Sequence, residues 1–166
     1  SKVYTIKTVQ KIEKLLQVSA AFLDEGDSIM QRVAGVLNIL GLIILIFAGL
    51  MLFPTAVSWY LDDHAVWNFV IGMAVAGTIG LLMWACTRRA FHGKELRNRD
   101  GFLLSALTWM VLPGIATIPL MLSIPGLSFT DAYFETMSGL TTTGATVISN
   151  LDQLPSSINV WRTFLV

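Results

Sequence analysis

The sequence predicts an all-α membrane protein that has three transmembrane helices, one re-entrant helix and the start of a further helix. The first observation is composition: of the 166 residues, 54% are hydrophobic and only 13% are charged, whereas soluble domains carry about 25% charged residues. The second is the distribution of the charges, which leaves three long apolar stretches between them. The third is a short amphipathic segment, 129–140, that ends in a run of threonines around one glycine.

The apolar stretches are long enough to cross a membrane. Residues 33–61, 65–87 and 101–130 contain no Asp, Glu, Lys or Arg, and each exceeds the roughly 20 residues that span the hydrocarbon core. The net charge is zero, so the charge balance does not favour nucleic acid as a partner. The basic residues form short clusters beside the apolar stretches, where they serve as topology signals. The chain is therefore predicted to be surrounded by membrane lipid.

Residues 1–28 form the first of three predicted units. Their apolar residues recur at helical spacing with lysines between them, which indicates an amphipathic helix lying on the membrane or docked to a partner. A partly ordered tail fits this segment equally well. The helix is expected to end near Gly26, and Asp27 or Ser28 can cap the next helix by accepting its free N–H groups.

Residues 29–100 form the second unit, a pair of transmembrane helices followed by a basic loop. The first span is predicted at 29–53 and ends before Pro54, because proline lacks the N–H that a helix interior needs. The second span is predicted at 65–86. Small residues repeat every four positions along it, at Gly72, Ala76 and Gly80. This spacing favours the close approach of a neighbouring helix.

The loops predict the orientation of these helices. Residues 88–100 contain five basic residues against two acidic ones, and basic loops stay on the cytoplasmic side. The loop 59–64 contains Asp62 and Asp63 and no Lys or Arg, so it is predicted to lie outside. Two crossings then place the N-terminus on the cytoplasmic side.

Residues 101–166 form the third unit. Its first span is predicted at 101–122 and contains Pro113 and Pro119. Each proline removes a backbone donor and clashes with the preceding turn, so we expect a kink or an early end there. The span exits on the outside, where Pro125-Gly126 marks a turn.

The segment 129–140 is predicted to be a helix that enters the membrane without crossing it. Ser128 and Asp131 resemble a capping box at its start, with Asp in place of the usual Glu. Asp131 and Glu135 lie in its first turns, where the helix dipole favours negative charge. The helix would be about 18 Å long, roughly half the bilayer.

The run 141–146 is the strongest candidate for a functional site. Non-helical backbone at membrane depth must be buried in protein or line water, so this run cannot face lipid. Its carbonyls, turned inward, can replace the hydration shell of a cation, and the C-terminus of the preceding helix adds negative partial charge. The candidate filter residues are Thr142, Thr143, Gly144, Ala145 and Thr146.

Three charged residues are candidate supports for this loop. Asp131 and Glu135 either attract cations to the pore mouth or only cap and anchor the helix, and the capping role fits Asp131 better. Arg162 lies in the last apolar run, where an unpaired charge is costly, so it should face protein or water. Glu135 and the loop carbonyls are its candidate partners.

Two other interpretations use the same residues. The threonine run could be an ordinary turn between short membrane helices, although the order of span, turn, half-length helix, Thr/Gly loop and new apolar run favours a filter. An intramembrane enzyme would have to use Asp131, Glu135, His64 or His92, and no pair of them has a suitable mutual spacing. We therefore expect no enzymatic activity.

Several motifs occur in the order and spacing of a known family. They are Asn98-Arg99-Asp100-Gly101-Phe102, Thr130-Asp131-Ala132-Tyr133-Phe134-Glu135, Ser138-Gly139-Leu140-Thr141-Thr142-Thr143-Gly144-Ala145-Thr146, Leu154-Pro155 and Trp161-Arg162. Over residues 30–166 the chain resembles the membrane subunit of Trk-type potassium uptake systems, in the Trk/Ktr/HKT superfamily. Residues 1–29 match nothing in that family.

The resemblance implies potassium uptake across the inner membrane of a bacterium. Such proteins hold four linked helix–pore-loop–helix repeats around one pore with fourfold pseudo-symmetry, often preceded by two extra helices. Here 29–100 would be that pair and 101–166 the first repeat, with the transported potassium at residues 142–146 and no tightly bound cofactor. The family usually forms homodimers and binds a cytosolic nucleotide-binding regulatory subunit.

The chain departs from the family in having only one filter motif. One loop cannot surround an ion, so we expect either an N-terminal fragment that is inactive alone or several copies assembled around one pore. The alternative function is a non-conducting membrane assembly or interaction subunit. The sequence leaves open whether transport is channel-like or symport with protons or sodium, and whether potassium is preferred to sodium.

Overall fold

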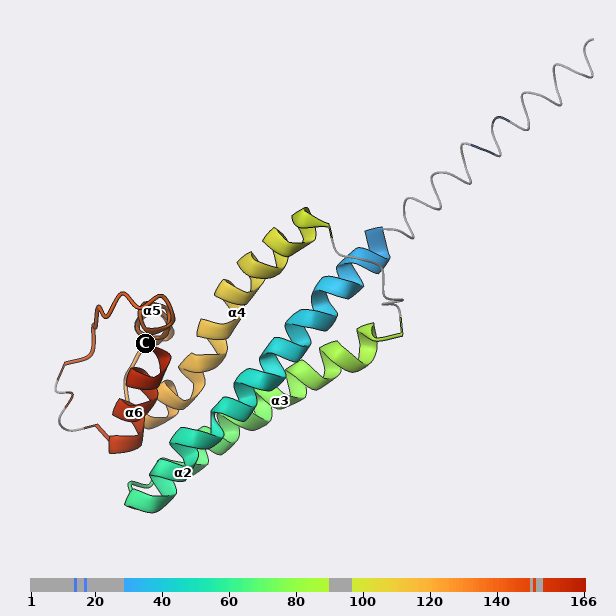
Figure 1. Ribbon diagram of the computed structural model, residues 1–166. Helices are drawn as coiled ribbons and strands as arrows, with labels where there is room; N and C mark the ends of the chain where they lie inside the picture. The colour runs from blue at the N-terminus through green and yellow to red at the C-terminus, as the bar shows by residue number, and fades with distance from the viewer. Residues whose placement is uncertain (1–13, 15–16, 18–28, 90–96, 150, 152–153) are drawn as a thin grey trace, which may run out of the picture.

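The computed structural model describes residues 14, 17, 29–89, 97–149, 151 and 154–166, and every regular element in these ranges is helical (Figure 1). Residues 29–50 are helical and run into α2 through Met51, which gives one apolar helix, Ile29–Leu61, of 33 residues. The labelled helices are α2 (Leu52–Leu61), α3 (Val66–Thr87), α4 (Asn98–Ser123), α5 (Phe129–Leu140) and α6 (Ser156–Leu165).

Two sequence predictions fall on residues that the structure does not describe. One is the amphipathic helix in 1–28 with its caps Asp27 and Ser28, of which only Lys14 and Gln17 are described. The other is the central part of the basic loop, 90–96, which includes His92.

Three helices are long and apolar enough to cross a membrane: Ile29–Leu61, α3 and α4. They follow one another as antiparallel neighbours, and α3 contacts both α2 and α4 (Figure 1). The predicted all-α membrane fold with three transmembrane helices is therefore confirmed. The half-length helix and the further helix are also present, as α5 and α6.

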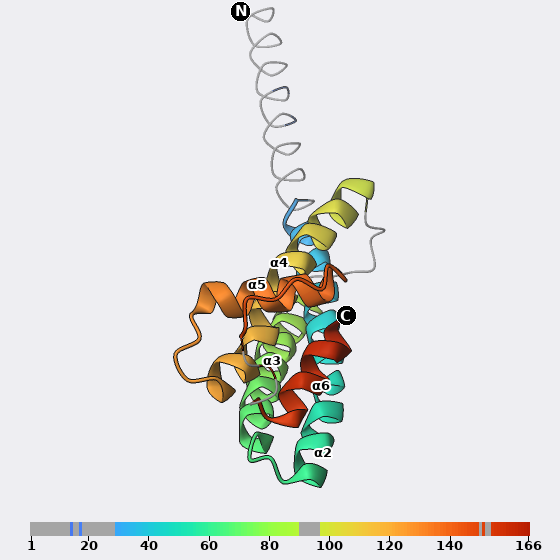
Figure 2. The same cartoon turned by 90° about the vertical axis from the view of Figure 1, so that its left-hand side faces the viewer.

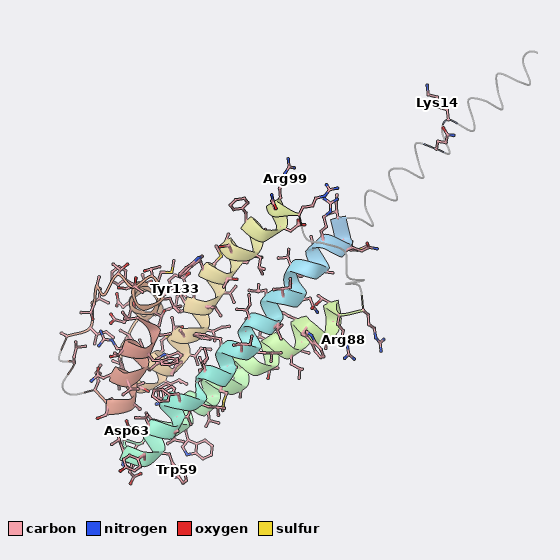
Figure 3. The ribbon with its side chains drawn as sticks, viewed as in Figure 1. Lys14, Trp59, Asp63, Arg88, Arg99 and Tyr133 are labelled. Carbon is pink, nitrogen blue, oxygen red and sulfur yellow. The ribbon has the colours of Figure 1, made fainter. Side chains whose placement is uncertain are left out.

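Charged residues lie at the two ends of this bundle. Asp63 is at one end with Trp59, whereas Arg88 and Arg99 are at the other (Figure 3). The end of α4 lies beside the start of α3: the side-chain amide of Asn68, in α3, donates to the hydroxyl of Ser123, in α4, at 2.8 Å. The loop at 62–65 and the turn after α4 are therefore at the same end.

Small residues bring the long helices close together. Gly72, Ala76 and Gly80 are all buried along α3. A Cβ atom on Gly80 would lie 2.9 Å from the carbonyl oxygen of Gly41, and a Cβ on Gly41 would lie 2.9 Å from that of Gly80. The spacing of small residues along α3 correctly predicted a close helix contact. The sequence alone did not identify the other helix of this contact, which is the one that contains Gly41.

Pro54 does not end the first span, contrary to the sequence prediction. It lies inside the apolar helix Ile29–Leu61, as the third residue of the part labelled α2. Proline removes one backbone donor, but the helical hydrogen bonds beside it are kept. The N–H of Met51 donates to the carbonyl of Phe47 at 3.3 Å, and the Met51 carbonyl accepts from both the N–H and the hydroxyl of Thr55, at 3.2 and 2.7 Å. The apolar helix therefore continues through the proline.

Pro113 and Pro119 do not end α4 early either, since the helix continues to Ser123. Prolines are tolerated inside membrane helices where neighbouring helices pack against them. Three carbonyls near the prolines accept hydrogen bonds from other helices: Met110 from Tyr133 at 3.1 Å, Pro113 from Thr136 at 3.0 Å and Ala116 from Trp161 at 3.3 Å. The prolines therefore mark the part of α4 against which α5 and α6 pack.

Trp161 of α6 is the centre of the core. Its side chain is fully buried. The ring centroids of Phe47 and Phe69 lie 5.7 and 6.1 Å from that of Trp161. Because these partners come from the first span and from α3, and the indole N–H donates to α4, one residue fixes α6 against all three long helices.

Candidate functional site

The helix α5 has the bounds that the sequence predicts, Phe129–Leu140. Ser128 caps it: the hydroxyl oxygen accepts from the backbone N–H of Asp131 at 3.1 Å, and the hydroxyl donates to the Asp131 carboxylate at 2.8 Å. Asp131 itself is exposed. The structure thus shows Asp131 in the capping arrangement, at the end of α5 away from the threonine run.

The helix α5 packs at mid-depth of the bundle and runs across the direction of the long helices (Figure 2). Its residues Tyr133 and Thr136 donate to the carbonyls of Met110 and Pro113, which are near the middle of α4. The loop that follows α5 therefore lies at the level of the centre of α4. This is the position expected of a re-entrant helix.

The backbone after α5 turns sharply. The N–H of Thr142 donates to the carbonyl of Gly139 at 2.7 Å, and the N–H of Thr143 donates to that of Ser138 at 2.9 Å. Thr142 has φ 54° and Gly144 has φ 71°. A positive φ suits glycine but is rare for a β-branched residue, so neighbouring structure must hold Thr142 in place. Such strained residues cluster at functional sites.

Ser138 supports the loop from α5, a role that sequence reasoning missed. Its hydroxyl donates to the carbonyl of Ala145 at 2.7 Å, while its own carbonyl accepts from Thr143. The carbonyl of Ala145 is therefore turned toward α5. Ser138 belongs to the motif that the sequence singled out, but nothing local in the sequence indicates this contact seven residues along the chain.

Glu135 is a buried acid of the site, and both of its carboxylate oxygens are hydrogen-bonded. It is only 6% exposed. Its Oε1 atom accepts from the Nε of Arg162 at 2.7 Å and forms an ion pair with Nη2 of the same residue. Its Oε2 atom accepts from the hydroxyl of Thr146 at 3.0 Å and from the N–H of Val147 at 3.1 Å. We refer to Glu135, Thr146, Val147 and Arg162 as the Glu135 cluster.

The Glu135 cluster joins three elements: α5, the end of the threonine loop, and α6. A buried carboxylate is tolerated when it is paired and its lone pairs are satisfied, and both oxygens of Glu135 meet this condition. Arg162 also donates to the hydroxyl of Thr146 at 3.1 Å. Of the two partners that the sequence left open for Arg162, the structure shows Glu135. Glu135 is therefore an interior anchor and does not have the exposed position of a mouth residue.

The loop is also accessible. Residues 141–147 are exposed. A hollow of about 200 Å³ lies where the loop meets α5 and α6, and its lining includes Glu135, Gly144 and Arg162. The loop is therefore fixed by Ser138 and the Glu135 cluster, and the rest of its surface is exposed. Exposed carbonyl and hydroxyl oxygens can coordinate a cation.

Of the remaining candidate residues, His64 lies away from this site. His64 is in the loop between α2 and α3, with φ 62°, and His92 is among the residues that the structure does not describe. The structure thus brings together Glu135, Thr146 and Arg162 with the candidate filter residues, and leaves Asp131 at the far end of α5.

Comparison with known proteins shows similarity to one family of cation transport proteins. The family described as "TrkH: Cation transport protein" matches residues 65–166. The Trk system potassium uptake protein TrkH of Halomonas elongata is 45% identical over 128 residues, which are 76% of this chain and 26% of that protein. The protein of the same name from Escherichia coli K12 is 40% identical over 129 residues, 77% of this chain and 26% of that protein.

A solved structure is also similar. The crystal structure of the potassium transporter TrkH from Vibrio parahaemolyticus matches with a TM-score of 0.74 and 41% sequence identity, covering 80% of this chain and 28% of that chain. The chain thus spans about a quarter of the length of the curated relatives that it matches.

Proposed function

Because the chain belongs to the TrkH family of cation transport proteins, we propose that it forms one wall of a pathway for potassium uptake across the cytoplasmic membrane of a bacterium. The observation that carries this proposal is the threonine–glycine loop held at mid-depth by α5 and α6. Irregular backbone at this depth must line protein or water, and the C-terminus of α5 directs negative partial charge at the loop.

The proposed filter residues are those that the sequence singled out, Thr142, Thr143, Gly144, Ala145 and Thr146. They do not contribute equally in this proposal. The Ala145 carbonyl accepts from Ser138 and the Thr146 hydroxyl donates to Glu135, so these groups hold the loop. The backbone oxygens of Thr142, Thr143 and Gly144 are the better candidates for contact with the ion. Arg162 supports the filter through Glu135.

One loop contacts an ion from one side only, so further filter segments are needed. We propose that they come from further repeats of the same protein, with 29–100 as the preceding helix pair and 101–166 as the start of the first repeat. The 166 residues alone should then be inactive. Rubidium flux into liposomes that contain only this chain measures this directly, and cation-selective flux would show that copies assemble into a complete pore.

The proposed orientation follows from the charges at the two ends of the bundle. Arg88 and Arg99 would be cytoplasmic, Asp63 would face outward, and the N-terminus would be cytoplasmic. Homodimerisation and a cytosolic nucleotide-binding regulatory subunit are further expectations from the family resemblance. Whether uptake is channel-like or symport depends on parts of the pathway outside the described loop.

The substitution Gly144→Asp tests the filter proposal, with Gly126→Asp as its matched control. Both glycines have positive φ, 71° and 82°, and a Cβ on either would meet no atom within 4 Å. The two substitutions therefore impose similar backbone strain and add the same charge. Only Gly144 lies in the proposed filter, so selective uptake should be lost in that variant and kept in the Gly126 variant.

The measurement is rubidium and sodium uptake by bacteria that lack their own potassium uptake systems and express the complete gene that encodes this sequence. Uptake is normalised to the amount of protein in the membrane. Wild-type selective uptake by the Gly144→Asp variant would exclude the filter role and favour the alternative of a non-conducting assembly subunit.

A further inference from the structure

Asp63, in the loop between α2 and α3, makes a contact that no role described so far uses. Its Oδ2 atom accepts from the backbone N–H of Ser157, in the first turn of α6, at 2.7 Å. Its Oδ1 atom accepts from the hydroxyl of Ser58 and from the N–H of Ala65, the latter at 3.2 Å. The carboxylate thus joins the outer end of the first helix pair to the start of α6, 94 residues along the chain.

The start of α6 has no acceptor of its own. Its N-cap is Pro155, which makes no side-chain capping bond, and no acidic residue lies in its first turn. The first N–H groups of a helix need acceptors, and negative charge there is favourable. Asp63 supplies both from a different part of the chain.

The same helix carries Arg162 into the Glu135 cluster. Ser157 and Arg162 are five positions apart, a rise of about 7.5 Å along a helix. The packing of α6 on α5 leaves little freedom, because a Cβ on Gly139 of α5 would lie 3.0 Å from Cβ of Leu165 of α6. A shift of the start of α6 would therefore move Arg162 relative to Glu135 and Thr146.

We propose that Asp63 is a positioning residue of the cation pathway, which fixes the start of α6 and thereby holds Arg162 against Glu135 and Thr146 at the end of the filter loop. This inference rests on the proposed function of that loop. In this proposal, the helix pair that precedes the first repeat helps to set the geometry of the filter, in addition to crossing the membrane.

The charge state of Asp63 agrees with this role. Partial burial by itself would raise the pKa of Asp63, but hydrogen bonds from Ser58, Ser157 and the backbone of Ala65 outweigh it, and the pKa lies below its ordinary value of 3.8. The side chain is therefore a carboxylate at neutral pH, with two oxygens able to accept hydrogen bonds at once.

The test compares Asp63→Asn with Asp62→Asn in the same uptake-deficient cells, with the complete gene. Asparagine has one accepting oxygen, so it cannot serve both Ser157 and the donors on Oδ1. Asp62 is exposed and has φ 52°, a conformation that Asn tolerates. Asp62→Asn therefore removes the same charge from the same loop without removing the anchor.

We expect the rubidium-to-sodium uptake ratio, at equal protein in the membrane, to fall about tenfold in Asp63→Asn, as loss of one charge-assisted hydrogen bond allows. The ratio should stay at the wild-type value in Asp62→Asn. Equal ratios in wild type and Asp63→Asn would overturn the inference while leaving the proposed function intact. No rubidium uptake by the wild type would overturn both.

A double variant, Asp63→Asn with Pro155→Asp, separates positioning from simple helix capping. Asp at position 155 gives α6 an N-cap acceptor of its own but does not tie α6 to the loop at 62–65. We expect the ratio to stay low in the double variant. Recovery of the wild-type ratio would mean that Asp63 only stabilises the helix, which would overturn the inference. The double variant also supplies a capped α6 for measurement if the single variant does not accumulate.

Discussion

Glu135 shows how a single buried acid can organise a loop. Two of its donors come from Arg162 and the others are the Thr146 hydroxyl and the Val147 N–H. A buried ion pair gains little net stability because both charges lose their hydration, but it fixes geometry, since any other arrangement leaves a charge unpaired. At this site, the geometry that is fixed is the end of the proposed filter.

We predict that Glu135→Gln loses both stability and selectivity. The substitution leaves Arg162, whose side chain is 17% exposed, without a charged partner, and removing one member of a buried pair typically costs about 3–5 kcal/mol. Thermal unfolding of the detergent-purified protein should shift to lower temperature. The rubidium-to-sodium uptake ratio should fall in the same variant.

Asp131→Asn is the control for this prediction. Asp131 lies on the same helix but is exposed and contacts Ser128, so its replacement should cost less than about 1 kcal/mol. Adding Arg162→Gln to Glu135→Gln should recover part of the stability, because a neutral pair leaves no buried charge. Wild-type selectivity of Glu135→Gln would mean that the ion pair does not set the filter geometry.

Local contacts of the site could be predicted from the sequence, whereas distant ones could not. The Ser128 cap follows from residues three positions apart. The need of Arg162 for a partner follows from the cost of a charge in the membrane, but choosing Glu135 required the packing of α6 on α5. Asp63 and Asp62 look alike in the sequence, and only the position of Ser157 distinguishes them.

At the level of elements, the spans were predictable because hydrophobic length is a local property. The predicted bounds of α5 agree with the structure, and those of α3 differ by one residue at each end. The errors occurred at prolines, where the sequence indicates a break. Side chains from α5 and α6 donate hydrogen bonds to the α4 backbone near its prolines, and this tertiary packing is not contained in a linear pattern.

The contact between Gly41 and Gly80 gives a prediction about helix packing. A Cβ on Gly80 would lie 2.9 Å from a backbone oxygen and 3.0 Å from the side chain of Leu45. The backbone cannot move locally, so Gly80→Ala must push the helices apart. Overpacking of this kind costs about 1–3 kcal/mol, which thermal unfolding in detergent should show as a lower midpoint.

Gly77→Ala is the matched control on the same helix. A Cβ there would meet no atom within 4 Å, and alanine is a better helix former than glycine by up to about 1 kcal/mol. The midpoint should therefore stay the same or rise. Equal effects of the two substitutions would argue against the close approach of the helices at Gly80.

For the whole molecule, the site is built from both parts of the chain. The helix pair at 29–89 contributes Asp63, Phe47 and Phe69 to the placement of α6, and the segment from 97 onward contributes the loop that α6 supports. In the proposed pathway, the exposed side of the loop would face groups outside these residues. The sequence could therefore predict the kind of pathway that we propose, but not which groups would complete its ion site.

The distribution of charge between the two ends gives the last prediction, which concerns orientation. Arg88 and Arg99 lie at one end and Asp63 at the other (Figure 3). Arg89 and Arg97, which are close to these arginines in the sequence, and Asp62, which is next to Asp63, are exposed. Basic residues are retained on the cytoplasmic side during insertion. In the complete gene, with Cys86, the single cysteine of these 166 residues, and every other cysteine replaced by serine, Asp62→Cys should react with a membrane-impermeant maleimide added to intact cells.

Arg89→Cys should react with the same reagent only after the cells are permeabilised. Retained rubidium uptake in both variants would show that each protein is folded and inserted. The opposite labelling pattern would mean that the bundle has the inverted orientation in the membrane. The proposed filter would then open toward the cytoplasm. An inward-facing Asp63 would still hold α6, because the contact with Ser157 lies within the chain. The positioning role and the orientation can therefore be tested independently.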